Sequence, residues 1–181
     1  MNKKISIYDI CEMAILIALA LILDKLKIQI GTNGGSINLS AIPLIIISIR
    51  KGFLKGLISS SIVFGILSCI FDGYGLQFLP FDYILAFSGY SLVGLFNGLL
   101  EKKISGKEKR LFISITFGCI LSFLIRIISH SLSSIIFYKF TILESLIYNF
   151  TYVSISSALC FAVLIALIKP IIVINDKFSK K

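Results

Sequence analysis

The chain has 181 residues, of which 57% are hydrophobic and 15% charged, and its formal net charge is +9. A soluble domain of this length has too little interior to hide so much apolar surface, so the composition excludes a soluble globular protein and predicts a membrane protein. The basic residues stand between hydrophobic segments instead of gathering on one face. This pattern carries information on membrane topology and does not indicate a nucleic-acid partner.

The first apolar stretch follows Lys3 and Lys4, and further apolar residues continue beyond it. This arrangement predicts an uncleaved first membrane span near residues 10–28. Ala14 and Ala18 stand four residues apart in this span. Such a pair of small residues lets another helix approach closely, and packing within the bundle explains it as well as docking onto a partner does.

The segment 28–38 is rich in glycine and asparagine and contains Gly35 and Ser36. Its backbone can adopt positive φ, so it can approach a ligand or fold back into the bundle. A plain flexible turn is equally consistent with this composition.

Four later segments are apolar and long enough to cross a bilayer as helices, near residues 53–71, 79–99, 111–131 and 145–168. The segment 37–49 is also apolar, but it is short and interrupted by polar residues. Whether it crosses the membrane decides the topology.

The interval 101–110 carries five basic residues and is therefore expected in the cytoplasm, as is the lysine-bearing N-terminus. Both can lie on one side only if an even number of spans separates them, which requires 37–49 to cross. The sequence thus predicts an all-α, single-domain bundle over residues 1–181. It has six transmembrane helices, and both termini are cytoplasmic.

With this topology, unusual polar residues gather at the outer face. Asp82 and Tyr83 follow Pro80 at the start of the fourth helix, where the helix N-terminus stabilises a carboxylate. A simple helix cap is one interpretation of Asp82. An acid at membrane depth nevertheless needs a partner, which favours a functional role.

Arg126 and His130 lie four residues apart near the end of the fifth helix and share one helix face. Arg126 either extends towards the membrane interface or faces an internal cavity. Tyr138, Tyr148 and Asn149 follow on the same side of the membrane. An aromatic belt explains interfacial tyrosines, whereas an asparagine amide requires hydrogen-bond partners.

An acid, an amide, an imidazole and several tyrosines on one side indicate a pocket for a polar, planar and cationic ligand. The sequence contains no phosphate-binding loop for ATP and no cysteine or histidine cluster at metal-ligand spacing. Ser129 and Ser131 flank His130, but neighbours on a helix point about 100° apart and make a poor nucleophile–base pair. We therefore expect no catalytic residue, no metal and no cofactor.

Short motifs run through the chain almost from end to end: Gly34-Gly35-Ser36, Ile42-Pro43, Arg50-Lys51-Gly52, Asp82 to Phe87, Gly94 to Phe96, Arg126 with His130, Phe137-Tyr138 and Ser145 to Asn149. In this order and spacing they resemble the thiamine-specific S component of energy-coupling factor (ECF) vitamin transporters.

The resemblance implies a multi-pass protein of the bacterial cell membrane that binds thiamine from the outside. Ala14 and Ala18 match the face through which such proteins dock onto a membrane T component with two ATPase subunits. The residues and the resemblance together assign substrate binding to Gly35, Ser36, Asp82, Tyr83, Arg126, His130, Tyr138, Tyr148 and Asn149.

The sequence also departs from the family pattern. It has no tryptophan, so Tyr138 stands at a position where relatives often stack the ligand on one. Glu144 occupies a position where a tyrosine is expected, so Tyr148 or Tyr152 would have to replace it. An S component for another small vitamin or thiamine precursor is the alternative, and a membrane interaction protein without transport function is another.

Overall fold

The computed structural model describes residues 6–30, 35–101 and 103–178. Lys3 and Lys4, which indicate the side of the N-terminus, and Gly34 of the Gly34-Gly35-Ser36 motif lie outside the described residues.

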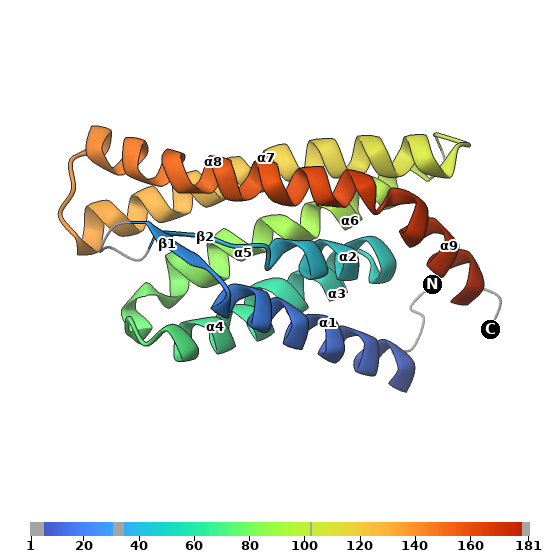
Figure 1. The fold of residues 1–181 in the computed structure, drawn as a ribbon, viewed down its shortest axis with the longest axis horizontal. Coiled ribbons are helices and arrows are strands. Elements are labelled where there is room, and N and C mark those ends of the chain that lie inside the picture. Colours follow the sequence, from blue (N-terminus) through green and yellow to red (C-terminus); the bar gives the residue numbers. More distant parts are fainter. Residues whose placement is uncertain (1–5, 31–34, 102, 179–181) are drawn as a thin grey trace.

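The chain is mostly helical, and its long helices run side by side along one axis (Figure 1). The helices and strands are α1 (Ile7–Lys25), β1 (Ile28–Ile30), β2 (Gly35–Ile37), α2 (Ala41–Lys51), α3 (Phe53–Leu57), α4 (Gly65–Asp72), α5 (Ala86–Ser88), α6 (Leu92–Leu100), α7 (Lys107–Phe137), α8 (Ile142–Ala166) and α9 (Ile168–Phe178).

Four helical runs in the described chain are long and apolar enough to cross a membrane: Phe53–Asp72, Leu76–Leu100, Lys107–Phe137 and Ile142–Ala166. They correspond to the four later spans that the sequence predicts, although the predicted end at residue 168 lies beyond the end of α8, and the predicted first span near residues 10–28 is not among them. A multi-pass membrane protein is therefore supported by the structure.

Two predicted spans differ from the structure in their bounds. The helix α1 begins at Ile7, earlier than expected, and ends at Lys25, because Ile28 already belongs to strand β1. The helix α2 has only 11 residues, and the predicted segment 37–49 begins in β2 and ends inside this helix. The all-α fold class does not include the two short strands Ile28–Ile30 and Gly35–Ile37, which pair with each other and are called the hairpin below.

The hairpin pairs Ile28 with Ile37 and Ile30 with Gly35 in antiparallel register. It packs against α8 because Gly35 has no side chain. A Cβ at this position would lie 2.7 Å from the Tyr148 hydroxyl and 2.8 Å from the Tyr152 ring. Close approach, and not positive φ, is therefore the reason for glycine here.

Two stretches within the membrane-length runs are π-helical, Ile58–Phe64 and Leu79–Leu85. They lie side by side, and the Ser61 hydroxyl donates a hydrogen bond of 2.8 Å to the Ile84 carbonyl. Wide helical turns of this kind are frequent at functional sites. The second stretch contains Asp82 and Tyr83.

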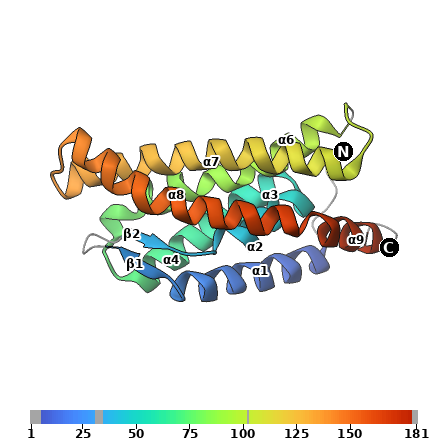
Figure 2. The same cartoon turned by 45° about the horizontal axis from the view of Figure 1, so that its top comes forward.

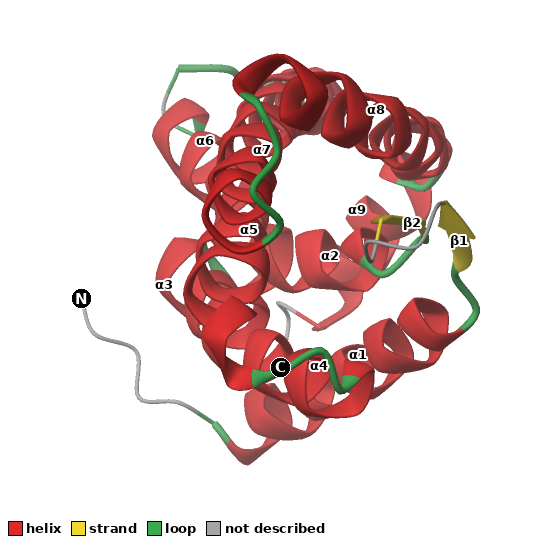
Figure 3. Cartoon of the chain, turned by 90° about the vertical axis from the view of Figure 1, so that its left-hand side faces the viewer, coloured by secondary structure: helices red, strands yellow, loops and turns green. Residues whose placement is uncertain are grey.

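The helix α2 occupies the middle of the bundle, where Leu44, Ile45 and Ile47 are buried. Figure 3, a view along the bundle, shows α2 inside a ring that includes α1, α4, α7 and α8. On its α6 side, Gly94 lies directly against the Ser48 carbonyl, so these two helices pack without an intervening side chain.

The helix α7 continues to Phe137, so His130 lies two turns inside the helix and does not close it as the sequence predicts. The serines after His130 lower the hydropathy, but their hydroxyls find partners within the bundle. The Ser134 hydroxyl donates to the His130 carbonyl at 2.8 Å, and the Ser145 hydroxyl donates to the Ser131 carbonyl at 3.0 Å.

The end of the bundle opposite the hairpin is held by ion pairs. Asp9 and Glu12 of α1 pair with Arg50 and Lys51 at the end of α2, and Asp9 also pairs with Lys55. The helix α9 continues from α8 at this same end (Figure 2). The polar hollow described next lies towards the hairpin end.

Candidate ligand-binding pocket

A hollow between the hairpin, α1, α4, α7, α8 and the second π-helical stretch encloses about 660 Å³, including the part open to the outside. The lining residues are Asp24, Lys27, Ser36, Asn38, Ser68, Asp72, Tyr74, Phe78, Asp82, Tyr83, Phe87, Arg126, His130, Ser134, Tyr138, Asn149 and Tyr152.

Seven of the predicted site residues line this hollow: Ser36, Asp82, Tyr83, Arg126, His130, Tyr138 and Asn149. Gly35 and Tyr148 are not among the lining residues, and they join the hairpin to α8 instead. The structure therefore brings together side chains that are far apart in the sequence, from Ser36 after the first span to Asn149 in α8.

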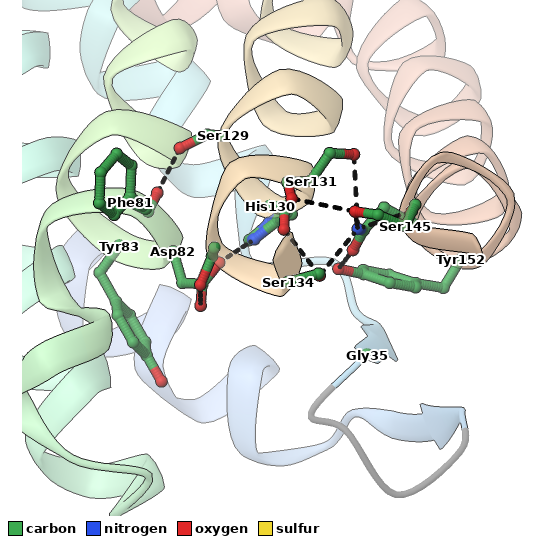
Figure 4. Close-up of polar contacts among 12 residues, drawn as sticks. Gly35, Phe81, Asp82, Tyr83, Ser129, His130, Ser131, Ser134, Ser145 and Tyr152 are labelled. Carbon is green, nitrogen blue, oxygen red and sulfur yellow. Dashed lines mark hydrogen bonds and ion pairs between the residues drawn. The ribbon is translucent and has the colours of Figure 1, made fainter. Parts of the chain in front are cut away.

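Asp82 is the residue that ties the π-helical stretch to α7. One carboxylate oxygen lies 2.7 Å from His130 Nδ1, and the other accepts a hydrogen bond of 2.6 Å from the Ser133 hydroxyl (Figure 4). Asp82 makes no side-chain cap of its own helix, so the simple cap interpretation does not hold. Its contacts instead orient the imidazole.

Two buried nitrogen atoms at the hollow have no hydrogen-bond partner among the described residues, His130 Nε2 and Arg126 Nε. Arg126 is 5% exposed, which excludes an extended position at the membrane interface. Its guanidinium lies 5.9 Å from the centre of the Tyr90 ring. Unpartnered polar atoms are costly when buried, so both residues are available for hydrogen bonds to a ligand.

Asn149 is 1% exposed, and its amide is already engaged. Its nitrogen donates to the Ser145 carbonyl at 2.9 Å and to the Ser134 hydroxyl at 3.1 Å, and its oxygen accepts from the Tyr152 hydroxyl at 2.7 Å (Figure 4). The amide thus joins α7 to α8 and fixes the Tyr152 ring at the edge of the hollow. Tyr152, and not Tyr148, is the α8 tyrosine that lines it.

A second polar group lies on the α4 side of the hollow. The Tyr83 hydroxyl donates to Asp72 at 3.1 Å, and Asp72 also pairs with Lys25 and Lys27. The charge of Asp72 is therefore balanced by the two lysines. Tyr83 lines the hollow, and its hydroxyl is bound to Asp72.

The aromatic wall of the hollow includes Phe78 and Tyr138, whose rings stack with centres 5.5 Å apart and planes 24° from parallel. Burial, and secondarily the charge of Asp82, raises the pKa of Tyr138, so its phenol is neutral. Stacked neutral rings of this kind provide a flat surface for an aromatic or cationic ligand, in a chain that lacks tryptophan.

The hairpin is fastened to α8 by the Tyr148 hydroxyl. This hydroxyl donates to the Ile30 carbonyl at 2.9 Å and accepts from the Gly35 amide at 3.0 Å. Because it contacts both strands, Tyr148 holds the hairpin over the hollow. Glu144, one turn earlier, forms a capping box with Thr141 at the start of α8 and lies outside the hollow.

Sequence reasoning missed several lining residues, above all Asp24, Asn38, Ser68 and Asp72. Asp24 had a usable signal, because it is an acid within the predicted span 10–28 and such an acid requires a partner. Asn38 interrupts the short apolar segment and had a weaker signal of the same kind. Ser68 and Phe87 resemble ordinary residues of a packed helix, so no sequence pattern marks them.

The arrangement is suited to binding and not to chemistry. The Ser129 hydroxyl next to His130 donates to the Phe81 carbonyl and points away from the imidazole (Figure 4). No group of three or more histidine, cysteine or acidic side chains in the described part of the chain could hold a metal ion. What remains is a polar hollow with aromatic rings, carboxylates, an imidazole nitrogen without a partner and a guanidinium nitrogen that can donate.

Comparison with known proteins gives a consistent picture. A family model described as thiamine transporter protein matches residues 10–175. The thiamine transporter ThiT of Bacillus subtilis (strain 168) is 30% identical over 178 residues, which covers 91% of this chain and 92% of that protein. A structure of ThiT from Listeria monocytogenes has the same fold, with a TM-score of 0.73 and 22% identity over 90% of this chain and 94% of that one.

Replacing Tyr148 by phenylalanine is expected to loosen the hairpin, because both strands lose a hydrogen bond of roughly 0.5–1.5 kcal/mol. Hydrogen exchange at the Gly35 amide and its β2 neighbours should become about tenfold faster. The matched control is Tyr8→Phe, which alters an exposed tyrosine on α1. Equal exchange in both variants would show that Tyr148 does not hold the hairpin.

Proposed function

The chain belongs to the thiamine transporter protein family, and from this premise we propose that it is the substrate-binding S component of an ECF-type importer that captures thiamine from outside the cell. The family consists of transporters and not of enzymes, which agrees with the expected lack of catalysis. The family membership that the sequence motifs predict is confirmed.

The observation that carries the proposal is the Asp82–His130 pair with its free Nε2 atom, next to the buried Arg126 and a stacked aromatic wall. Thiamine combines an aminopyrimidine, a thiazolium cation and a hydroxyethyl tail. The aminopyrimidine offers donors and acceptors for the imidazole and the carboxylate, and the aromatic rings suit the flat cation. Arg126 can donate to the tail or to a phosphate on it.

The other predicted residues have supporting roles in this proposal. Ser36 and Tyr83 complete the wall, while Gly35 and Tyr148 hold the hairpin that covers the pocket. Asn149 acts through Tyr152, because its amide is already occupied within the bundle.

We further propose six membrane crossings with both termini in the cytoplasm, in which β2 and α2 together make the second crossing. The 11 residues of α2 span about 16 Å and the three residues of β2 about 10 Å, and the non-helical residues 38–40 between them make up the remainder of a hydrocarbon core of about 30 Å. Non-helical backbone at this depth needs partners from the protein. The Ser156 hydroxyl provides them, since it donates to the Asn38 carbonyl at 2.8 Å and accepts from the Asn38 amide.

Ala14 and Ala18 support docking onto a T component with two ATPase subunits in the bacterial cell membrane. Both are exposed on α1, whereas Ala20 is buried against the bundle. The pair is thus not used for packing within the described part of the chain. Because both side chains are small, a partner helix can pack closely against this face of α1.

Thiamine binding to the purified protein, measured by calorimetry, tests the proposal. Asp82→Asn and His130→Ala should each weaken binding by about 1–3 kcal/mol, because each leaves a buried polar partner unsatisfied. Asp176→Asn, an exposed change on α9, should leave the affinity unaltered. A folded wild-type protein without saturable binding would overturn the proposal, and tighter binding of a pyrimidine precursor would favour the alternative substrate.

Cysteine labelling tests the topology in a variant whose native cysteines are replaced by serine. Three crossings separate Gln29 from Lys107 if α2 crosses, and two if it does not. A membrane-impermeant maleimide should therefore label Gln29→Cys in intact cells but Lys107→Cys only after permeabilisation. Labelling of both from the same side would exclude six crossings.

Ala14→Trp tests the docking surface. The indole would keep a partner helix away from α1, so thiamine uptake should fall to background while thiamine binding by the purified variant stays normal. Phe112→Trp enlarges an exposed residue of α7 and should retain uptake. Normal uptake by Ala14→Trp would remove this face from the docking surface.

A further inference from the structure

Asp24 is a carboxylate in the pocket wall that has not yet been given a role. It is 4% exposed, and it accepts hydrogen bonds from the Asn38 amide at 2.9 Å and from the Ser68 hydroxyl at 2.8 Å. It forms no ion pair within the described chain, because its two partners are neutral. It joins α1 to the segment after β2 and to α4.

The orientation of the Asn38 amide is fixed from the other side. Its oxygen accepts from the Ser40 backbone amide at 3.2 Å and from the Ser40 hydroxyl at 2.8 Å. Its nitrogen is therefore turned towards Asp24, and this nitrogen can only donate. The Asp24 oxygen that faces it is held as an acceptor.

The other charges of the pocket do not neutralise Asp24. Lys27 lies 2.5 Å from Asp72, and Lys25 contacts the same carboxylate at 3.2 Å from a side chain that is 46% exposed. Arg126 forms no ion pair in the described structure, and Asp82 is bound by His130 and Ser133. Among the lining residues, three aspartates thus face one lysine and one arginine, an excess of one negative charge when His130 is neutral.

We propose that Asp24 supplies the negative charge that balances the thiazolium cation of the ligand and so selects cationic over neutral ligands. The inference rests on the proposed function and deepens it. In this proposal the two carboxylates have different roles. Asp82 and His130 form hydrogen bonds with the aminopyrimidine, while Asp24 faces the positively charged thiazolium ring. A buried, unpaired carboxylate is costly in the empty protein, and a monocation removes that cost when it binds.

The test compares thiamine with an analogue in which a neutral thiophene replaces the thiazolium ring. The ratio of the two dissociation constants, measured by calorimetry, gives the preference for the cation. Asp24→Asn should reduce this preference by about ten- to thirtyfold, as expected for the loss of one nearby charge in a partly buried site. The substitution is isosteric: its amide oxygen can accept from Asn38, and its nitrogen can donate to the Ser68 hydroxyl.

Two further variants complete the design. Asp176→Asn makes the same chemical change at the far end of the molecule and should leave the preference unchanged. Lys27→Gln removes a positive charge from the pocket wall while Asp72 keeps Lys25, so it should increase the preference. Because Lys27→Gln also removes a cation from Asp72, it does not test Asp24 alone. If Asp24→Asn protein does not fold, Asp24→Ser removes the same charge and takes its place.

The outcomes separate the two proposals. A wild-type protein that does not bind thiamine overturns the proposed function, and this inference falls with it. A wild-type protein that binds thiamine, together with an unchanged preference in folded Asp24→Asn or Asp24→Ser, overturns the role of Asp24 alone. Equal weakening of both ligands by Asp24→Asn would likewise assign Asp24 a structural role.

Discussion

The hydrogen bonds of the Asp82 carboxylate determine how the pocket is built. They join the π-helical stretch Leu79–Leu85 to α7, at His130 and Ser133. Without these acceptors the serine and imidazole groups of α7 would be polar atoms at membrane depth with no partner, which is costly. The same contacts allow α7 to continue to Phe137, and they turn His130 Nε2 towards the hollow. One half-buried acid thus fixes the orientation of the imidazole and leaves its second nitrogen open for a ligand.

On the hairpin side of the pocket, polar groups at membrane depth also need hydrogen-bond partners, and here these groups belong to the backbone. Residues 35–40 are not helical, so their backbone groups need partners from neighbouring helices. Ser156 binds both polar groups of the Asn38 backbone, and Tyr148 binds one from each strand. Because α8 supplies these partners, the hairpin depends on α8 for its position. The pocket is consequently lined on this side by a segment that α8 holds in place.

The sequence predicts part of the pocket, because polar residues in apolar spans are rare and therefore conspicuous. Asp82, Arg126 and His130 are identified in this way, and the structure brings all three to one hollow. The hairpin could not be predicted, since its strands Ile28–Ile30 and Gly35–Ile37 have only three residues each and their pairing leaves no periodic pattern in the sequence. The extension of α7 was missed for a related reason: its serines lower the hydropathy, and their partners lie on other segments. Helix boundaries thus depend on contacts that no single segment reveals.

The partners of each polar group distinguish those that hold the fold from those that are free for a ligand. Tyr83, Asn149 and Asp72 have their hydrogen bonds satisfied within the bundle, so they shape the hollow without offering much to an occupant. Arg126 and His130 Nε2 are not satisfied in the described structure. A membrane protein that leaves a buried guanidinium beside only an aromatic ring accepts a less stable empty state. Ligand binding can then be tight, because the ligand supplies the hydrogen bonds that Arg126 and His130 lack in the empty protein.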